Sequence, residues 1–197
     1  MKSCCVILAA GLSSRMGRFK PLLPIEGRPA IVHLIHTLQS AGVDECIIVT
    51  GHRAEEIEQA CHSVKKVSFV HNPDYATTGM FESAKIGFGV VPSDCTRVLF
   101  TPADIPLIPE EIVKTLLAKN EPLIYPSYQY HKGHPVILDA DLLSRVLAFE
   151  GKGGLRGALA SLPVEPSYLV TDDPRILMDM DTPEDYQAIV SESEKHI

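Results

Sequence analysis

The sequence predicts an α/β fold built on a mostly parallel, twisted sheet. Short apolar runs rich in β-branched residues recur along the chain, and segments with helical periodicity separate the early runs. Strands that alternate with helices form crossover units, which join parallel strands. The apolar runs, each a predicted strand, cover residues 4–10, 45–50, 66–71, 97–101, 122–125 and 135–138.

Four segments carry the helical pattern. In 31–38 the apolar side chains follow i, i+3, i+4, i+7 spacing, so they share one helical face. Further helices are predicted near 54–61, 81–90 and 109–118, with Pro109 suited to a first turn. Parallel sheets bind ligands beyond the carboxyl ends of their strands, so we expect the chemistry just after each strand.

The second half of the chain is less regular. Residues 125–134 read as a polar, aromatic loop, and residues 150–157 are rich in glycine. Neither segment is long enough to form a separate domain, and no internal repeat is visible. We therefore expect one domain over residues 1–197.

Composition narrows the class of protein. Hydrophobic residues make up 45% of the 197 residues, as in a globular chain with a sizeable core. A net charge of −7 argues against nucleic acid as a partner, although a local basic cluster can still hold a small anion. No apolar run approaches the ~20 residues of a membrane span. The five cysteines are odd in number and lack C-x-x-C spacing, which predicts a reducing, cytoplasmic location.

The first apolar run is followed by the most informative segment, residues 8–24. Gly11 permits positive φ and close backbone approach, so successive N–H groups can point at an anion. Arg15, Arg18 and Lys20 then place three cations within six positions, where a secretory signal would need a small-residue cleavage site. We expect no signal peptide here. The loop suits a triphosphate, the plainer alternative being a solvated basic loop.

The residues of this loop exclude two common phosphate-binding motifs. Gly17 is not followed by Lys-Ser/Thr, as a Walker A loop requires, and Ser13 stands where a dinucleotide fingerprint needs glycine. The segment instead resembles the NTP transferase signature L-A-[AG]-G-x-[SG]-x-R-M-G-x-x-K. It is most similar to the branch that makes dinucleotide forms of the molybdenum cofactor, and the resemblance covers nearly the whole chain.

The resemblance implies a fold and a nucleotide site. The fold would be a Rossmann-like three-layer sandwich of the nucleotide-diphospho-sugar transferase type. The catalytic residues would be Arg15 and Lys20, which contact the phosphates in that family. The loop residues that hold the nucleotide would be Leu8, Ala9, Ala10 and Gly11.

Two acidic positions are candidates for Mg²⁺, which often uses one or two carboxylates together with substrate phosphates. Asp104 follows a predicted buried strand, and Asp181 precedes a predicted helix that begins with Pro183. From spacing alone, Asp181 or Thr182 reads as a helix N-cap more readily than as a metal ligand. The family comparison implies that Asp104 and Asp181 both bind Mg²⁺, while Asp179 has a supporting role.

Resemblance also suggests residues for the base and the acceptor. Asn72, Gly79 and Ser83 match the family's N-P-x(5)-G-M-x-x-S element, which lies against the base, although a capped turn before a core helix explains them equally well. His134 matches the G-H-P segment that approaches the acceptor pterin. Arg156 lies in a glycine-arginine stretch near the acceptor phosphate, where the family's acidic residue is missing from this chain.

These features predict transfer of a nucleoside monophosphate to a phosphate acceptor with release of pyrophosphate. Ala10 resembles the L-A-A-G form of the cytidylyltransferases, whereas guanylyltransferases usually carry L-A-G-G. CTP and molybdopterin, or the molybdenum cofactor, are the expected pair, with a molybdenum hydroxylase or its chaperone as the expected downstream partner. The alternatives are a sugar-1-phosphate nucleotidyltransferase and a non-catalytic maturation partner of a molybdenum hydroxylase.

Overall fold

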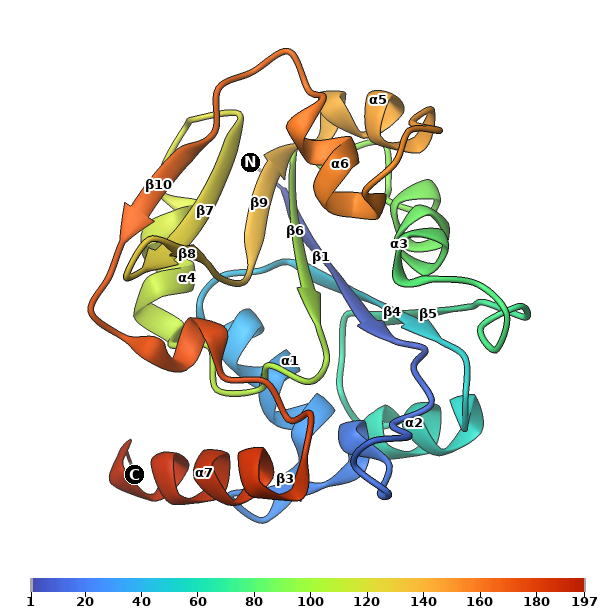
Figure 1. Cartoon of the computed structure of the whole chain (residues 1–197), viewed down its shortest axis with the longest axis vertical. Coiled ribbons are helices and arrows are strands. Elements are labelled where there is room, and N and C mark those ends of the chain that lie inside the picture. Colours follow the sequence, from blue (N-terminus) through green and yellow to red (C-terminus); the bar gives the residue numbers. More distant parts are fainter. Residues whose placement is uncertain (1, 197) are drawn as a thin grey trace.

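A twisted sheet of eight strands forms the centre of the molecule (Figure 1). The computed structural model describes residues 2–196, so Met1 and Ile197, the ends of the predicted domain, lie outside the described residues. The strand order is β10-β7-β9-β6-β1-β4-β5, with β8 paired to β7. The strands are β1 (Ser3–Ala9), β4 (Glu45–Thr50), β5 (Val67–His71), β6 (Arg97–Pro102), β7 (Leu123–Tyr128), β8 (His131–Lys132), β9 (Val136–Asp139) and β10 (Ser167–Val170).

The sheet is mostly parallel, as predicted. β6, β1, β4 and β5 pair in parallel, and so do β7 and β10. Among the described strands of this sheet, only β9 and the short β8 run antiparallel to their neighbours. A small ribbon of β2 (Pro24–Ile25) and β3 (Arg28–Pro29) lies outside this sheet.

Helices cover both faces of the sheet and give it three layers (Figure 1). Successive residues of β1 face opposite sides: Cys5 and Ile7 join the core under α1, α2 and α4, and Cys4 and Val6 join the core under α3, α5 and α6. The helices are α1 (Ala30–Ser40), α2 (Ala54–Cys61), α3 (Met80–Gly89), α4 (Glu110–Leu117), α5 (Leu143–Leu147), α6 (Gly154–Ala160) and α7 (Pro183–Ser193). Short 3-10 turns are η1 (Lys20–Leu22), η2 (Ala140–Leu142), η3 (Pro174–Leu177) and η4 (Glu194–His196).

Local sequence accounts for where the helices lie. The predicted apolar face of α1 is fully buried, because its side chains at i, i+3, i+4 and i+7 all point at the sheet. Pro109 precedes α4 as its N-cap residue instead of standing in the first turn, a shift of one position. At α7, Thr182 is the N-cap and forms a capping box with Asp185, while Pro183 takes the first helical position.

Two parts of the second half differ from the sequence-based expectation. The predicted loop 125–134 contains the end of β7 and the strand β8, joined by a tight turn in which Gln129 and Tyr130 both have positive φ. The sequence did not predict this hairpin, because apolar and polar residues do not alternate clearly in this segment. The glycine-rich segment 150–157 contains the start of α6. Gly153 is the N-cap residue and Gly154 the first residue of this helix, and both have positive φ. β10 was not predicted, because its four residues are too short to show a pattern.

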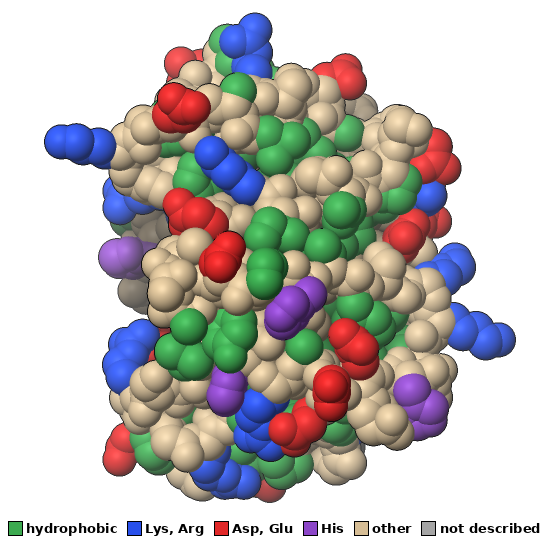
Figure 2. All heavy atoms as spheres, turned by 90° about the vertical axis from the view of Figure 1, so that its right-hand side faces the viewer, with side chains coloured by type: hydrophobic (Ala, Val, Ile, Leu, Met, Phe, Trp, Pro, Cys, Tyr) green, Lys and Arg blue, Asp and Glu red, His purple; other side chains and the backbone are tan. Residues whose placement is uncertain are grey.

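The surface agrees with the charge balance. Figure 2 shows acidic and basic side chains interspersed over one face, without a continuous basic stripe on that face. All five cysteines are buried and free. Within residues 2–196, no helix combines the length and apolar character that crossing a membrane requires.

Candidate active site

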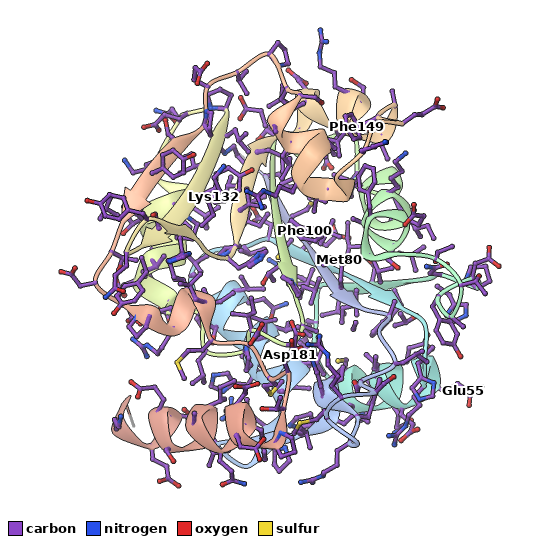
Figure 3. All side chains as sticks on the ribbon, viewed as in Figure 1. Glu55, Met80, Phe100, Lys132, Phe149 and Asp181 are labelled. Atoms are coloured by element: carbon purple, nitrogen blue, oxygen red, sulfur yellow. The ribbon has the colours of Figure 1, made fainter. Side chains whose placement is uncertain are left out.

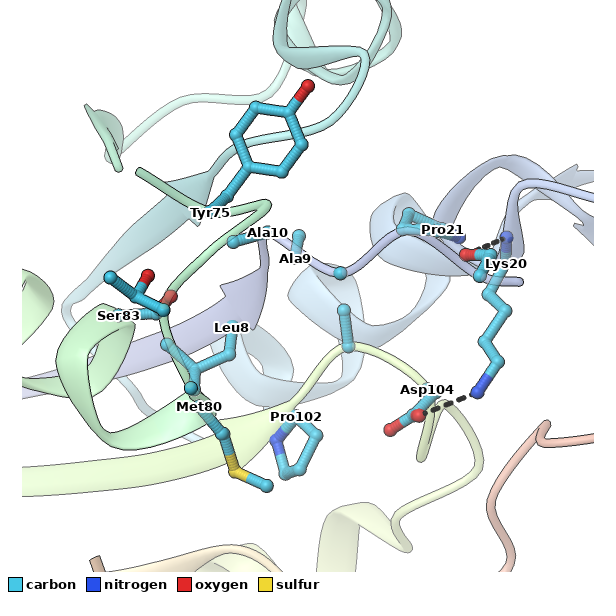
Figure 4. A pocket seen from close by; sticks show the side chains of 15 residues that line it. Leu8, Ala9, Ala10, Lys20, Pro21, Tyr75, Met80, Ser83, Pro102 and Asp104 are labelled. Atoms are coloured by element: carbon cyan, nitrogen blue, oxygen red, sulfur yellow. Dashed lines mark hydrogen bonds and ion pairs between the residues drawn. The ribbon is translucent and has the colours of Figure 1, made fainter. Parts of the chain in front are cut away.

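A cavity of about 250 Å³ opens at the carboxyl ends of β1 and β6, beside the start of α3 (Figure 4). This is the edge of the sheet where the sequence predicted chemistry. In Figure 4, Tyr75 stands at one end of the cavity and Lys20 with Asp104 at the other, with Ala9 and Ala10 between them. The lining residues are Leu8, Ala9, Ala10, Gly11, Ser13, Lys20, Pro21, Tyr75, Thr78, Gly79, Met80, Ser83, Pro102, Ala103 and Asp104.

The loop after β1 turns through left-handed backbone conformations at Ser13 (φ 55°) and Gly17 (φ 66°). Gly11 does not have positive φ, so the sequence-based expectation that this glycine is needed for a left-handed conformation is wrong. A Cβ built on Gly11 would meet no atom within 4 Å, which leaves open space beside the loop backbone. The Ser13 hydroxyl accepts a hydrogen bond from the backbone N–H of Lys20 at 3.2 Å and thereby closes the loop onto η1.

Lys20 lies between the two predicted metal ligands. Its Nζ is 3.1 Å from Oδ2 of Asp104 and 2.6 Å from Oδ1 of Asp181. The backbone also joins the two acidic segments, because the N–H of Met180 donates to the carbonyl oxygen of Asp104 at 2.9 Å. Three residues that are far apart in the sequence therefore converge at one end of the cavity.

The charges of this cluster stabilise one another. Burial of Lys20 opposes its charge, but hydrogen bonds and charge from Asp181 and Asp104 outweigh that effect and raise the pKa of Lys20. The hydrogen bond from Lys20, supported by the charge of Arg15, holds the pKa of Asp181 below its ordinary value. Burial, together with the charges of Asp181 and Asp104, raises the pKa of the neighbouring Asp179.

The other two cations of the loop have different surroundings. Nη1 of Arg15 lies 2.7 Å from Oδ2 of Asp181, but the Arg15 side chain is 74% exposed. The guanidinium carbon of Arg18 lies 6.0 Å from the ring centroid of Tyr186 in α7. Lys20, whose side chain is only 12% exposed, is therefore the loop cation built into the cavity wall.

The turn between β5 and α3 depends on Asn72, which is buried but does not line the cavity. Its amide nitrogen donates to the hydroxyls of Thr78 (3.1 Å) and Ser83 (2.9 Å), and its oxygen accepts from the N–H of Asp74 (2.9 Å). Thr78 and Ser83 do line the cavity. We therefore expect Asn72 to position these two side chains instead of touching a ligand itself.

Gly79 is the N-cap residue of α3 and has no side-chain capping bond. The first N–H groups of a helix have no partner within the helix. Because Gly79 and Met80 line the cavity, this end of α3 offers donors to a bound ligand. The structure thus brings Gly79 and Ser83 into the cavity and keeps Asn72 behind them.

The two predicted acceptor residues lie outside the cavity wall. His134 sits where β9 meets β6: its Nδ1 is 3.4 Å from the carbonyl oxygen of Phe100, and burial lowers its pKa. The charge of Asp104 acts on the pKa of His134 in the opposite direction. Arg156 lies exposed on α6. No ion pair holds its guanidinium within the part of the chain that the structure describes.

The donor set suits a divalent ion that arrives with its substrate. Asp104 and Asp181 already share one cation, the ammonium of Lys20, so their oxygens face a common point. Among the described residues, no three His, Cys, Asp or Glu side chains are arranged to hold a metal ion. Two carboxylates fit Mg²⁺ that draws its remaining ligands from phosphates and water.

Tyr75 is absent from the sequence-based prediction. It lines the cavity and packs against Gly51, where an added Cβ would lie 2.7 Å from the Cβ of Tyr75 and 2.8 Å from the oxygen of Ala10. The ring of His52 lies 6.1 Å from the Tyr75 ring. Its place inside the motif between Asn72 and Ser83 was the signal that could have identified it.

The layered α/β fold and the glycine loop beside two convergent carboxylates define an enzyme of the nucleotidyltransferase type. Residues 5–166 match the MobA-like NTP transferase domain, and the chain belongs to that family. It is 30% identical over 184 residues to the molybdenum cofactor cytidylyltransferase of Escherichia coli (strain K12), with 92% of each chain covered.

Solved structures agree with this fold. A nucleotidyl transferase from Methanothermobacter thermautotroptrophicus superposes with a TM-score of 0.85 at 26% identity, over 100% of this chain and 99% of that one. Rv0371c from Mycobacterium tuberculosis H37Rv, solved as a complex with manganese, gives a TM-score of 0.80 at 20% identity, over 97% of this chain and 99% of that one. The second likeness supports the fold alone.

Proposed function

We propose that this chain transfers CMP from CTP to the phosphate of molybdopterin or the molybdenum cofactor, with Mg²⁺ as cofactor and pyrophosphate as the second product. The observation that carries the proposal is the cluster of Lys20, Asp104 and Asp181 at one end of a cavity that a glycine loop lines. Likeness over 92% of the chain to a molybdenum cofactor cytidylyltransferase supports this choice of donor and acceptor.

The reaction needs positioning and neutralisation of charge more than acid–base chemistry. An oxygen of the acceptor phosphate attacks the α-phosphorus of CTP, and the bond from that phosphorus to the oxygen bridging to the β-phosphorus breaks. Pyrophosphate leaves with the electron pair. A phosphate acceptor is already ionised at neutral pH, so no general base has to remove a proton.

Lys20 and Arg15 would offset the negative charge that develops on the α-phosphate and the leaving group. Lys20 is suited to this because its side chain is largely shielded from water, and a cation acts more strongly where the dielectric constant is low. Asp104 and Asp181 would hold Mg²⁺, which supplies further positive charge to the triphosphate. Lys20 would then exchange its carboxylate partners for phosphate oxygens.

Ala10 supports CTP as the donor. It lines the cavity beside Gly51 and Tyr75, so its methyl group takes up space near the place where we expect the base. His134 and Arg156 are the candidates for the acceptor side. A molybdenum hydroxylase or its chaperone would receive the product. Five buried, unpaired thiols suit a reducing compartment, so we assign the reaction to the cytoplasm.

Pyrophosphate release tests the proposal. The purified chain is incubated with CTP, GTP, UTP or dTTP, with Mg²⁺ or with a chelator, and with or without molybdopterin under anaerobic conditions. We expect release to require CTP, Mg²⁺ and molybdopterin together. Release with a sugar 1-phosphate but not with molybdopterin would contradict the acceptor, and absence of release with every pair would contradict catalysis.

A further inference from the structure

A cluster of two tyrosines and one lysine lies at the β10 edge of the sheet, away from the cavity. The rings of Tyr125 in β7 and Tyr168 in β10 are stacked, with centroids 6.1 Å apart and planes 23° from parallel. Nζ of Lys132 in β8 lies 4.3 Å from the Tyr125 centroid and 5.4 Å from the Tyr168 centroid. We call these three residues the aromatic shelf.

Lys132 is held in place without a carboxylate. The turn at Gln129 and Tyr130 folds β8 back onto β7, where Lys132 pairs with Ser127. No acidic side chain among residues 2–196 forms an ion pair with Lys132, although the chain carries a net charge of −7. An exposed ammonium over two aromatic faces can still accept an anion. The shelf therefore offers a positive charge beside flat apolar surface.

The outer part of the shelf is uncovered. Tyr125 is buried at 9% exposure, but Tyr168 is 47% exposed, and Val170, on the same face of β10, is 77% exposed. Side chains two apart along a strand share a face, so Tyr168 and Val170 form one open surface. The next residue on the opposite face, Leu169, packs against the core with α1 and α4. The open surface is thus the continuation of the face under α3 and α6.

The shelf and the cavity share this face. Phe100 of β6, Val136 of β9 and Tyr125 of β7 all belong to the core under α3 and α6. Pro102, two residues beyond Phe100, lines the cavity. Three strand spacings of ~4.8 Å separate β6 from β10, so the shelf lies roughly 15 Å from the cavity edge. Figure 3 shows Phe100 between Lys132 and Met80, which lines the cavity.

We propose that the aromatic shelf binds the planar ring system of the acceptor, while the acceptor's phosphate reaches the cavity. The inference rests on the proposed function, since it gives a binding site to the ring system of the same acceptor whose phosphate reacts in the cavity. Stacking on an exposed tyrosine requires a flat, π-rich group, and Lys132 favours one with negative charge or electronegative edges. Such a ligand follows the carboxyl edge of the sheet from β10 to β6, because Phe100 and Val136 are themselves buried. His134, two residues before β9, lies along that edge.

Two substitutions separate ring binding from nucleotide binding. Tyr168→Leu removes the exposed ring, and Lys132→Gln removes the charge. Direct binding is measured with pterin-6-carboxylate, a fluorescent, planar anion, and a chain without tryptophan has little emission of its own to interfere. We expect each substitution to raise the Kd of this probe at least about fivefold, as loss of one stacked aromatic contact does elsewhere. The Kd for CTP should stay unchanged.

Conservative and neighbouring variants serve as controls. Tyr168→Phe and Lys132→Arg keep the ring and the charge, so they should bind the probe almost as the parent chain does. Tyr130→Leu removes a fully exposed tyrosine from the same hairpin and should have no effect. In the pyrophosphate-release assay, Tyr168→Leu should raise KM for molybdopterin and leave kcat and KM for CTP unchanged.

The failures are distinguishable. If the parent chain turns over molybdopterin but Tyr168→Leu and Lys132→Gln leave both the probe Kd and KM unaltered, the shelf assignment is wrong and the proposed function stands. If Tyr168→Leu changes the sedimentation coefficient and not probe binding, the shelf is a contact between copies and the assignment is also wrong. If the parent chain uses no molybdopterin, the proposed function fails, while probe binding still decides the shelf.

Discussion

Nζ of Lys20 lies 2.6 Å from Oδ1 of Asp181, a residue 161 positions further along the chain. The contact joins the loop after the first strand to the segment before the last long helix, so it exists only in the folded protein. It also marks the point where the side chains of Lys20, Asp181 and Asp104 meet. A lysine and two carboxylates that share one site can exchange partners when a triphosphate and a divalent ion arrive.

Lys20→Ala should lower kcat by about 10²–10³-fold, because loss of one preorganised charge-stabilising donor costs ~2.7–4 kcal/mol. The melting temperature should change little, since Asp104 and Asp181 remain partly exposed and water can solvate them. Turnover at saturating CTP and thermal unfolding are measured together. Lys65→Ala is the matched control, because this exposed lysine lies on the loop before β5. Near-normal turnover of Lys20→Ala, or its unfolding, would contradict this role.

Asp104→Asn and Asp181→Asn should each weaken the Mg²⁺ dependence of turnover. The double variant should lose less than the two single losses combined, because both carboxylates act through one ion. A double-mutant cycle on kcat/KM, measured against Mg²⁺ concentration, gives the coupling energy. Asp141→Asn, at an exposed position before α5, controls for loss of charge alone. Simple additivity would show that the two carboxylates act separately.

Ala10→Gly should raise the use of GTP relative to CTP without abolishing CTP use. The methyl group of Ala10 lies in the cavity wall near Tyr75, and its removal frees space for a larger ring. Pocket shape discriminates by about 1–3 kcal/mol per methylene-sized group, so the preference should shift about 5- to 150-fold. Competition at equal CTP and GTP concentrations measures it. A parent chain that prefers GTP, or an unchanged ratio in Ala10→Gly, would contradict the steric argument.

Asn72→Ala should affect stability and nucleotide binding together. Its amide joins Thr78, Ser83 and Asp74 in a buried position, and loss of such a hub leaves buried polar groups unpaired at about 1–3 kcal/mol. Urea denaturation measures the free energy of unfolding, and titration calorimetry measures the Kd for CTP. Ser83→Ala should weaken CTP binding with a smaller loss of stability. An Asn72→Ala chain of normal stability with weakened CTP binding would instead indicate direct contact.

Hydrophobic periodicity in the sequence predicted the long, regular helices and strands of the fold. α1 shows the reason: four apolar residues at helical spacing all turn out to be fully buried. The β7–β8 hairpin and β10 escaped prediction because their pairing depends on positive φ at Gln129 and Tyr130 and on partners far along the chain. Such tertiary pairing leaves no local pattern in four residues.

The candidate site divides in the same way. Residues carried by one continuous loop, such as Gly11 and Lys20, could be placed together from the sequence. The meeting of Lys20 with Asp181 could be inferred only through the family resemblance, because nothing local to either residue indicates it. The motif between Asn72 and Ser83 pointed to the segment that holds Tyr75, but its packing depends on the absence of a side chain at Gly51, which no local pattern indicates.

The fate of the α-phosphate tests the central claim most directly. The chain is incubated anaerobically with Mg²⁺, molybdopterin and CTP radiolabelled at its α-phosphate. The products are then separated, and their masses are measured by mass spectrometry. We expect the label to move into a conjugate of CMP and molybdopterin, with one pyrophosphate released for each conjugate formed. Label that stays in CTP, or that appears as free CMP while molybdopterin remains unmodified, would contradict it.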